Sequence, residues 1–157
     1  MIVGDIVYFS NIIFEKAYYN DENVILVDHC SHNGRPCIYL GQIDDKMYFI
    51  PITGNNKYSD MGVCINVTKS NRLLKPSYLV LNNIICKESS YYYTKGFINE
   101  HVMYDLFKKF IDYYEEFNYC LRTFPNIGKV YELAIEYVDC YERPVVKHKK
   151  KRCKKKG

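Results

Sequence analysis

Residues 28–56 read DHCSHNGRPCIYLGQIDDKMYFIPITGNN, and this stretch decides how the chain folds. It predicts a polar loop, a strand over residues 36–43, a two-residue break at Asp44-Asp45, a second strand over residues 46–52 and another polar loop. Both runs are rich in β-forming residues. Because antiparallel neighbours bring their outer ends together, we expect the residues before the first strand to meet those after the second.

Polar side chains flank this predicted hairpin on both sides. They are His29, His32, Arg35, Thr53, Asn55 and Lys57. A cation, imidazoles and a hydroxyl gathered at one end of a hairpin can bind a phosphodiester and move its protons. The alternative is an ordinary solvated loop end without chemistry.

The rest of the chain predicts more short strands and then two helices. Strands are expected over residues 6–9, 24–27, 62–67, 78–86 (bulged at Asn82-Asn83) and 91–94, with a helical turn or an irregular arm within residues 10–23. Apolar residues then recur at spacings of three and four, from an N-cap at Asn99 to Phe117. Residues 119–124 break this helix, and Pro125 suits the opening of a second. Strands followed by helices indicate an α+β domain of five to six strands: a small, twisted antiparallel sheet or half-open barrel packed by two helices.

The apolar positions of the two helices define their expected buried faces. In the first helix they are Val102, Met103, Leu106, Phe107, Phe110, Ile111, Tyr114 and Phe117. In the second they are Ile127, Val130, Tyr131, Ala134, Tyr137 and Val138.

Composition and charge divide the chain into a body and a tail. The whole chain has 48% hydrophobic residues, and residues 1–146 are expected to form a single globular domain. They carry 14 basic and 18 acidic residues, so the net charge of +4 comes from residues 147–157, a basic tail with eight cations that we expect to be flexible. The tail is either a solvated end or an electrostatic handle for a polyanion. The absence of a membrane-length apolar run and of a signal peptide predicts a cytoplasmic protein without a membrane partner.

Seven cysteines without a C-x-x-C pair predict reduced thiols, several of them core residues. His29, Cys30, His32 and Cys37 are of metal-ligand types, but no second donor pair follows at a zinc-site spacing. We therefore predict no metal and no other cofactor. A Cys30 nucleophile paired with a histidine is a further, weaker reading, since nothing marks an orienting third group.

Three stretches carry a family resemblance. Residues 4–8 (GDIVY), residues 34–40 (GRPCIYL) followed by 49–53 (FIPIT), and residues 77–81 (SYLVL) with 84–85 and 96–98 resemble, in this order, the MazF/Kid-type toxin ribonucleases. Within that superfamily the chain is most similar to the ToxN and CptN toxins of RNA-inhibited (type III) toxin–antitoxin systems. The resemblance spans roughly residues 4–117.

This resemblance implies an SH3-like half-barrel that cuts single-stranded RNA without a metal. It implies that Arg35 and Thr53 serve the reaction. ToxN-like members place a serine after the threonine, where this chain has Gly54, so that hydroxyl is missing or comes from Ser59 or Ser10. The implied partners are substrate RNA and an antitoxin, expected to be RNA with a protein as second choice, in an oligomeric complex.

The residue chemistry fits such a reaction. Arg35 offers a permanently charged fork to phosphoryl oxygens, and His32 or His29 can be the base or the acid. Thr53 can hold the phosphate through its hydroxyl. The residues expected to contact RNA are Tyr8, Ser10, Lys57, Ser59, Lys69 and Arg72. The competing hypothesis is a non-catalytic module that binds nucleic acid or protein on the same small barrel.

Overall fold

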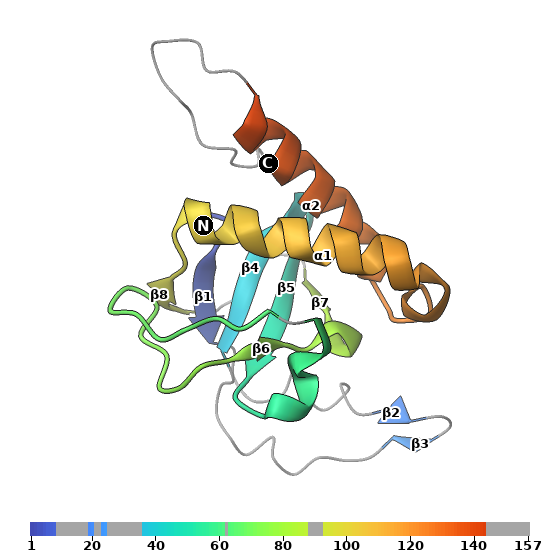
Figure 1. Ribbon diagram of the computed structural model, residues 1–157, viewed down its shortest axis with the longest axis horizontal. Coiled ribbons are helices and arrows are strands. Elements are labelled where there is room, and N and C mark those ends of the chain that lie inside the picture. The colour runs from blue at the N-terminus through green and yellow to red at the C-terminus, as the bar shows by residue number, and fades with distance from the viewer. Residues whose placement is uncertain (9–18, 21–22, 25–35, 62, 88–92, 144–157) are drawn as a thin grey trace.

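One antiparallel sheet and two helices make up most of the described structure (Figure 1). The computed structural model describes residues 1–8, 19–20, 23–24, 36–61, 63–87 and 93–143. The sheet strands are β1 (Asp5–Tyr8), β4 (Pro36–Ile43), β5 (Lys46–Thr53), β6 (Tyr78–Leu79), β7 (Ile85–Lys87) and β8 (Tyr93–Phe97). Their order is β6-β5-β4-β1-β8, and β7 also pairs with β5. The helices are α1 (Glu100–Leu121) and α2 (Ile127–Glu142), so the α+β class is confirmed.

The hairpin of β4 and β5 is the centre of the sheet, as residues 36–52 predicted. Its register runs from Cys37 opposite Pro51 to Ile43 opposite Lys46, and it shifts by one residue between Tyr39 and Gly41. The turn residue Asp44 has φ 57, a left-handed conformation that aspartate tolerates better than most residues.

The register shift lies where α2 approaches the sheet. Gly41 has φ +137, and a Cβ built on it would lie 2.9 Å from Cδ2 of Leu133 in α2. Glycine is therefore required at this position for two reasons: the backbone conformation and the close helix.

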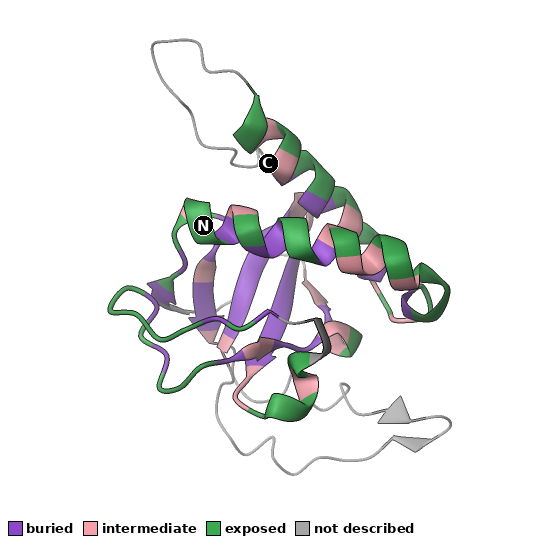
Figure 2. Ribbon diagram, viewed as in Figure 1, coloured by how far each residue is buried: buried purple, intermediate pink, exposed green. Residues whose placement is uncertain are grey.

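Burial in β4 and β5 does not alternate. Five consecutive residues of each strand are buried, residues 37–41 and 48–52. An antiparallel strand with one solvated face would alternate, so both faces of this hairpin are covered. Figure 1 shows α1 crossing in front of β1, β4 and β5, and Figure 2 shows buried positions along the sheet and exposed positions on the outer faces of the helices.

The first helix begins where the sequence predicted. The side chain of Asn99 accepts a hydrogen bond from the backbone N–H of Val102 at 3.0 Å, which is an N-cap. The helix continues through Leu121, four residues beyond the predicted end, with a non-helical backbone at Phe117. Of the predicted apolar face, Val102 is exposed, whereas Met103, the next residue, is fully buried.

The second helix begins later than predicted. Pro125 does not occupy the first helical turn, because Asn126 follows it with φ 64 and α2 starts at Ile127. The predicted face is otherwise buried or half-buried, and Leu133, which the pattern left out, belongs to it.

Three strand predictions need correction. Residues 63–66 do alternate between buried and exposed, but they form only one bridge, between Ile65 and Ser77, because no ladder partner runs alongside. Residues 78–86 are not one strand: β6 pairs with the last two residues of β5 and β7 with residues 47–49, and a 3-10 turn, η4 (Leu81–Asn83), replaces the predicted bulge. The last strand runs on through Gly96 to Phe97.

The segment before the hairpin is described only in part. Two short strands, β2 (Tyr19–Asn20) and β3 (Asn23–Val24), pair with each other, so the strand predicted at residues 24–27 begins one residue earlier and β2 was not predicted. The remainder of residues 9–35 and the tail lie outside the described residues.

Of the five described cysteines, four are free as predicted, but only Cys37 is buried, so the expectation of several core cysteines is wrong for the described residues. Cys37 is buried and free, and Cys64, Cys86 and Cys120 are also free. Cys140 is disulfide-bonded, so the prediction of reduced thiols is wrong there. None of the described helices combines the length and the apolar character that crossing a bilayer demands.

Candidate active site

Four strand ends meet at one end of the sheet. Tyr8, the last residue of β1, pairs with Pro36, the first residue of β4. Thr53, the last residue of β5, pairs with Tyr78, the first residue of β6. Since Cys37 pairs with Pro51, the start of β4 and the end of β5 lie at the same end of the hairpin. We call this the Thr53 end; in Figure 1 it is the end of the sheet away from α1.

The loop that leaves β5 is fixed by its own polar groups. The Thr53 hydroxyl oxygen accepts a hydrogen bond from the Asn55 N–H at 3.2 Å, and the Asn55 side chain accepts one from the Lys57 N–H at 3.0 Å. Tyr58 N–H also donates to the Asn55 carbonyl at 3.1 Å. These local turns are typical of threonine and asparagine, and they lead into a 3-10 helix, η3 (Asn56–Met61). The loop therefore presents the half-buried Thr53 in one defined arrangement.

Two lysines extend from this end. Lys57 is exposed, with its ammonium 5.4 Å from the centre of the Tyr58 ring. Lys75 is exposed too, and it lies across Gly54: a Cβ built there would be 2.4 Å from its Cε and 2.9 Å from its Cδ. Among the side chains that the structure describes, no carboxylate forms an ion pair with either lysine. Both charges are therefore available to an anion.

The segment from Thr53 into β7 is basic although the body is acidic, and Lys57 and Lys75 are its cations at the Thr53 end. Residues 53–86 contain four cations (Lys57, Lys69, Arg72 and Lys75) and one acid, Asp60. This local excess of positive charge was not visible when charge was counted only for residues 1–146 and for the tail. A basic surface with aromatic neighbours is suited to a nucleic-acid strand.

Tyr78 adds a hydroxyl but no base. A hydrogen bond with the Cys64 side chain raises the pKa of Tyr78 above its ordinary value. The phenol stays protonated at neutral pH and cannot accept a proton there, and its hydroxyl is already engaged with Cys64.

The predicted site residues divide into three groups. Tyr8, Thr53, Lys57 and Ser59 lie at or next to the Thr53 end, with the Tyr8 side chain on the opposite face of the sheet from Thr53 and Ser59 exposed on η3. Arg35, His29, His32 and Ser10 lie outside the described residues. Lys69 and Arg72 form the third group.

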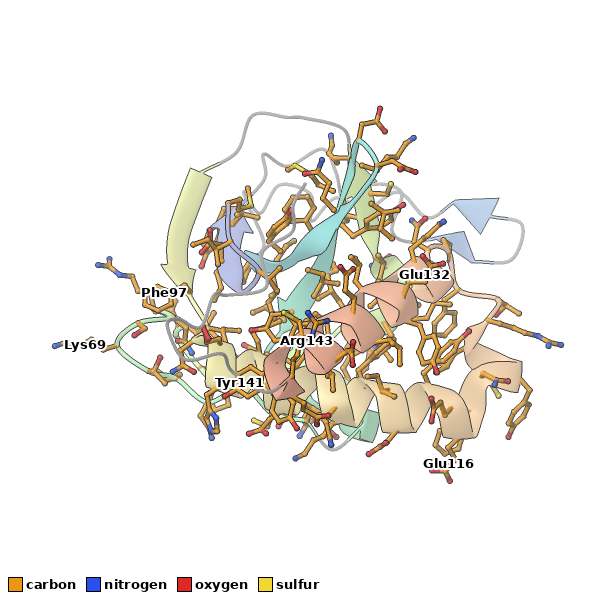
Figure 3. All side chains as sticks on the ribbon, turned by 90° about the horizontal axis from the view of Figure 1, so that it is seen from above. Lys69, Phe97, Glu116, Glu132, Tyr141 and Arg143 are labelled. Carbon is orange, nitrogen blue, oxygen red and sulfur yellow. The ribbon has the colours of Figure 1, made fainter. Side chains whose placement is uncertain are left out.

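Lys69 and Arg72 belong to a loop at the opposite end of the strands. Ser70 accepts a hydrogen bond from the Phe97 N–H at 3.0 Å, and Phe97 pairs with Asp5, the first residue of β1. Figure 3 shows Lys69 extending outward on the same side as Phe97. The structure therefore does not bring these two cations to the Thr53 end.

A buried asparagine fixes this loop. Asn71 is 3% exposed; its side chain accepts from the N–H groups of Thr68 and Leu73 and donates to the Asn66 carbonyl, all within 3.1 Å. These bonds hold Arg72 at φ 55 with its side chain exposed. The chain then continues from this loop to Lys75, which the sequence analysis did not include among the candidate site residues. Its only sequence signal was its place in a basic linker before Pro76.

Metal-ligand types do not gather in the described part of the chain. No group of three His, Cys, Asp or Glu side chains there could hold a metal ion, and the His29–Cys30–His32 cluster lies outside it.

The chain matches no protein-family model, no curated protein and no solved structure. Its function is therefore inferred from its own residues.

Proposed function

We propose that this protein is a metal-independent endoribonuclease, the toxin of a toxin–antitoxin system, similar to ToxN and CptN within the MazF/Kid-type toxins. The observation that carries the proposal is the Thr53 end. There Thr53 and Lys57 lie at the same end of the sheet as Tyr8 and the start of β4, the strand that Arg35 immediately precedes in the sequence.

The sheet supports the SH3-like half-barrel that the proposal includes. β5 pairs with β4 along one edge and with both β6 and β7 along the other. The hairpin is buried on both faces, as the central strands of a curling sheet would be. In such a barrel, chemistry is expected on the loops at a strand end, held by the rigid sheet.

The proposed reaction is transfer of the phosphodiester to the neighbouring 2′ oxygen of the RNA itself. The 2′ oxygen bonds to phosphorus, the bond from phosphorus to the 5′ oxygen breaks, and the products are a 2′,3′-cyclic phosphate and a 5′-hydroxyl. The 2′ proton passes to a base, and the leaving 5′ oxygen receives a proton from an acid. His32 and His29 are assigned these two roles, without deciding which is which.

The remaining residues stabilise charge and position. Arg35 binds the phosphoryl oxygens through two N–H groups as their negative charge grows. The Thr53 hydroxyl accepts the Asn55 N–H, which leaves its own proton to donate to a phosphoryl oxygen. Lys57 adds positive charge, and Tyr8 provides a ring on which a base can stack.

The partners follow from the same reading. The substrate is single-stranded RNA in the cytoplasm, and an antitoxin, RNA by preference and protein as the alternative, holds the toxin inactive in an oligomeric complex. An RNA antitoxin would bind the same basic segment as the substrate, because both are polyanions.

The Thr53 hydroxyl provides the test. The purified protein should cleave labelled single-stranded RNA, and Thr53→Val, which keeps the shape and removes the hydroxyl, should lower the rate by about 10²–10³. Thr53→Ser keeps the hydroxyl and should retain most of the rate. A Thr53→Val protein with unchanged activity would refute this site. A wild-type protein that binds RNA without cutting it would favour the non-catalytic module instead.

A further inference from the structure

Lys75 lies in the space that a side chain at position 54 would occupy. A Cβ on Gly54 would be 2.4 Å from Cε of Lys75, 2.9 Å from Cδ and 3.1 Å from Cγ. The whole aliphatic part of the lysine therefore lies against the glycine. Its ammonium, one bond beyond Cε, is placed beside the corner where Thr53 leaves β5.

The backbone of Lys75 is anchored from both sides. The hydroxyl of Ser77 donates to the Lys75 carbonyl at 3.0 Å, and Ser77 itself is 5% exposed and joined to Ile65 by two backbone hydrogen bonds of 2.8 and 3.0 Å. Pro76 restricts Lys75 to an extended backbone, and Leu73, two residues before it, is buried in the core. The stem thus starts from a fixed point, while the side chain is exposed.

The charge at this corner has no described counter-ion. Lys75 forms no ion pair with a carboxylate in the part of the chain that the structure describes, and Lys57 extends from the same loop system. A lysine that lies along Gly54, the residue after Thr53, is suited to a phosphate, which can take an ammonium charge and a hydroxyl hydrogen bond together.

We propose that Lys75 binds a phosphate of the RNA at the Thr53 end, and that residue 54 is glycine because the lysine crosses it. The proposal rests on the proposed function and adds a substrate-contacting residue to it. It also accounts for Gly54 standing where a serine was expected: a cation from a loop 21 residues further along the chain fills the space of that side chain.

The first test is the salt dependence of binding to a 2′-O-methyl RNA oligonucleotide, which cannot be cleaved. Loss of one phosphate contact should weaken binding and lower the slope of log Kd against log salt by about 0.7. We expect this for Lys75→Ala and for Lys75→Met, which keeps most of the stem but not the charge. Lys75→Arg should retain the slope. Lys109→Ala, an exposed lysine on α1, removes the same charge elsewhere and should behave as wild type.

The second test moves the lysine without removing it. Gly54 does not have a positive φ, and the atoms that a Cβ would meet belong to a flexible side chain, so Gly54→Ala should fold normally and displace Lys75. It should lower the salt slope as Lys75→Ala does, and the double variant should be no worse than Lys75→Ala alone. Gly128→Ala is the matched control, because a Cβ there meets nothing within 4 Å.

The outcomes separate the two proposals. Wild-type affinity and slope in Lys75→Ala, with RNA cleavage intact in the wild type, would overturn the role of Lys75 alone. An effect of Gly54→Ala that persists undiminished in the Lys75→Ala background would overturn the link between them. A wild-type protein that neither binds nor cleaves RNA would overturn both proposals.

Discussion

Gly41→Ala tests whether α2 reaches the sheet through the register shift in β4. The glycine has φ +137, and an L-residue there costs about 1–3 kcal/mol. The added Cβ would also lie 2.9 Å from Cδ2 of Leu133, and overpacking of this kind costs about 1–3 kcal/mol. We expect the free energy of unfolding to fall by about 2–6 kcal/mol, a large part of the total stability of a small domain.

A double-mutant cycle separates the two causes. Leu133→Ala alone should cost about 2–4 kcal/mol through the cavity it leaves. In that background the close contact is gone, so adding Gly41→Ala should cost only the backbone part, and the coupling should be about 1 kcal/mol or more.

Urea unfolding followed by far-UV circular dichroism gives these values, because the chain has no tryptophan for fluorescence. Gly128→Ala, in α2 with open space around its Cβ, is the control and should raise stability by up to about 1 kcal/mol. A Gly41→Ala protein within about 0.5 kcal/mol of wild type would refute the close approach. If the effects of Gly41→Ala and Leu133→Ala simply added, Leu133 would not be the cause of the destabilisation by Gly41→Ala.

Three further predictions concern pH, the site and the tail. Burial, and then the Cys86 side chain, raise the pKa of Tyr48 to about 12. The stability that protonated Tyr48 contributes is therefore fully present below the ordinary pKa near 10, and it is lost as the pH rises from 10 to 12. Stability should therefore fall by roughly 2–3 kcal/mol over that window, and Tyr48→Phe should flatten the fall in urea titrations; an unchanged slope would contradict it. Arg35→Ala should lower RNA cleavage by about 10²–10³ in a folded protein, with Arg35→Lys recovering only part; unchanged cleavage would remove Arg35 from the site. Truncation after Val146 should weaken RNA or antitoxin binding and flatten its salt dependence without changing turnover at saturating RNA; an identical salt slope would make the tail a solvated end.

The sequence predicted best what is local. The β4–β5 hairpin followed from two β-forming runs and a two-residue break, and the N-cap of α1 followed from Asn99 and the apolar period after it. Both elements depend on residues that are close together in the sequence, and a sequence pattern includes those residues.

The sequence prediction failed where the structure of a segment depends on a contact with residues far away in the chain. Residues 63–66 alternate as a strand does, yet only Ile65 finds a partner, Ser77. From the sequence, Gly41 was an ordinary interior residue of a strand. The contact that requires a glycine there is with Leu133, which is 92 residues away.

The candidate site divides in the same way. The sequence placed Thr53 and Lys57 at a hairpin end, because register follows from the turn. It grouped Lys69 with them by charge alone, and a hydrogen bond between Ser70 and Phe97 holds that loop at the other end. Lys75 could not be found, since its position depends on crossing Gly54.

The proposed ribonuclease chemistry is tested most directly by the products formed without metal. The purified protein should be incubated with single-stranded RNA in excess EDTA, and the new 3′ ends should be identified by whether phosphatase removes their phosphate before and after acid treatment. Attack by the 2′ oxygen predicts full cleavage in EDTA and 2′,3′-cyclic phosphate ends, which resist phosphatase until acid opens the ring. Cleavage that stops in EDTA and returns with a divalent ion, or that leaves 3′-hydroxyl ends, would contradict the proposal.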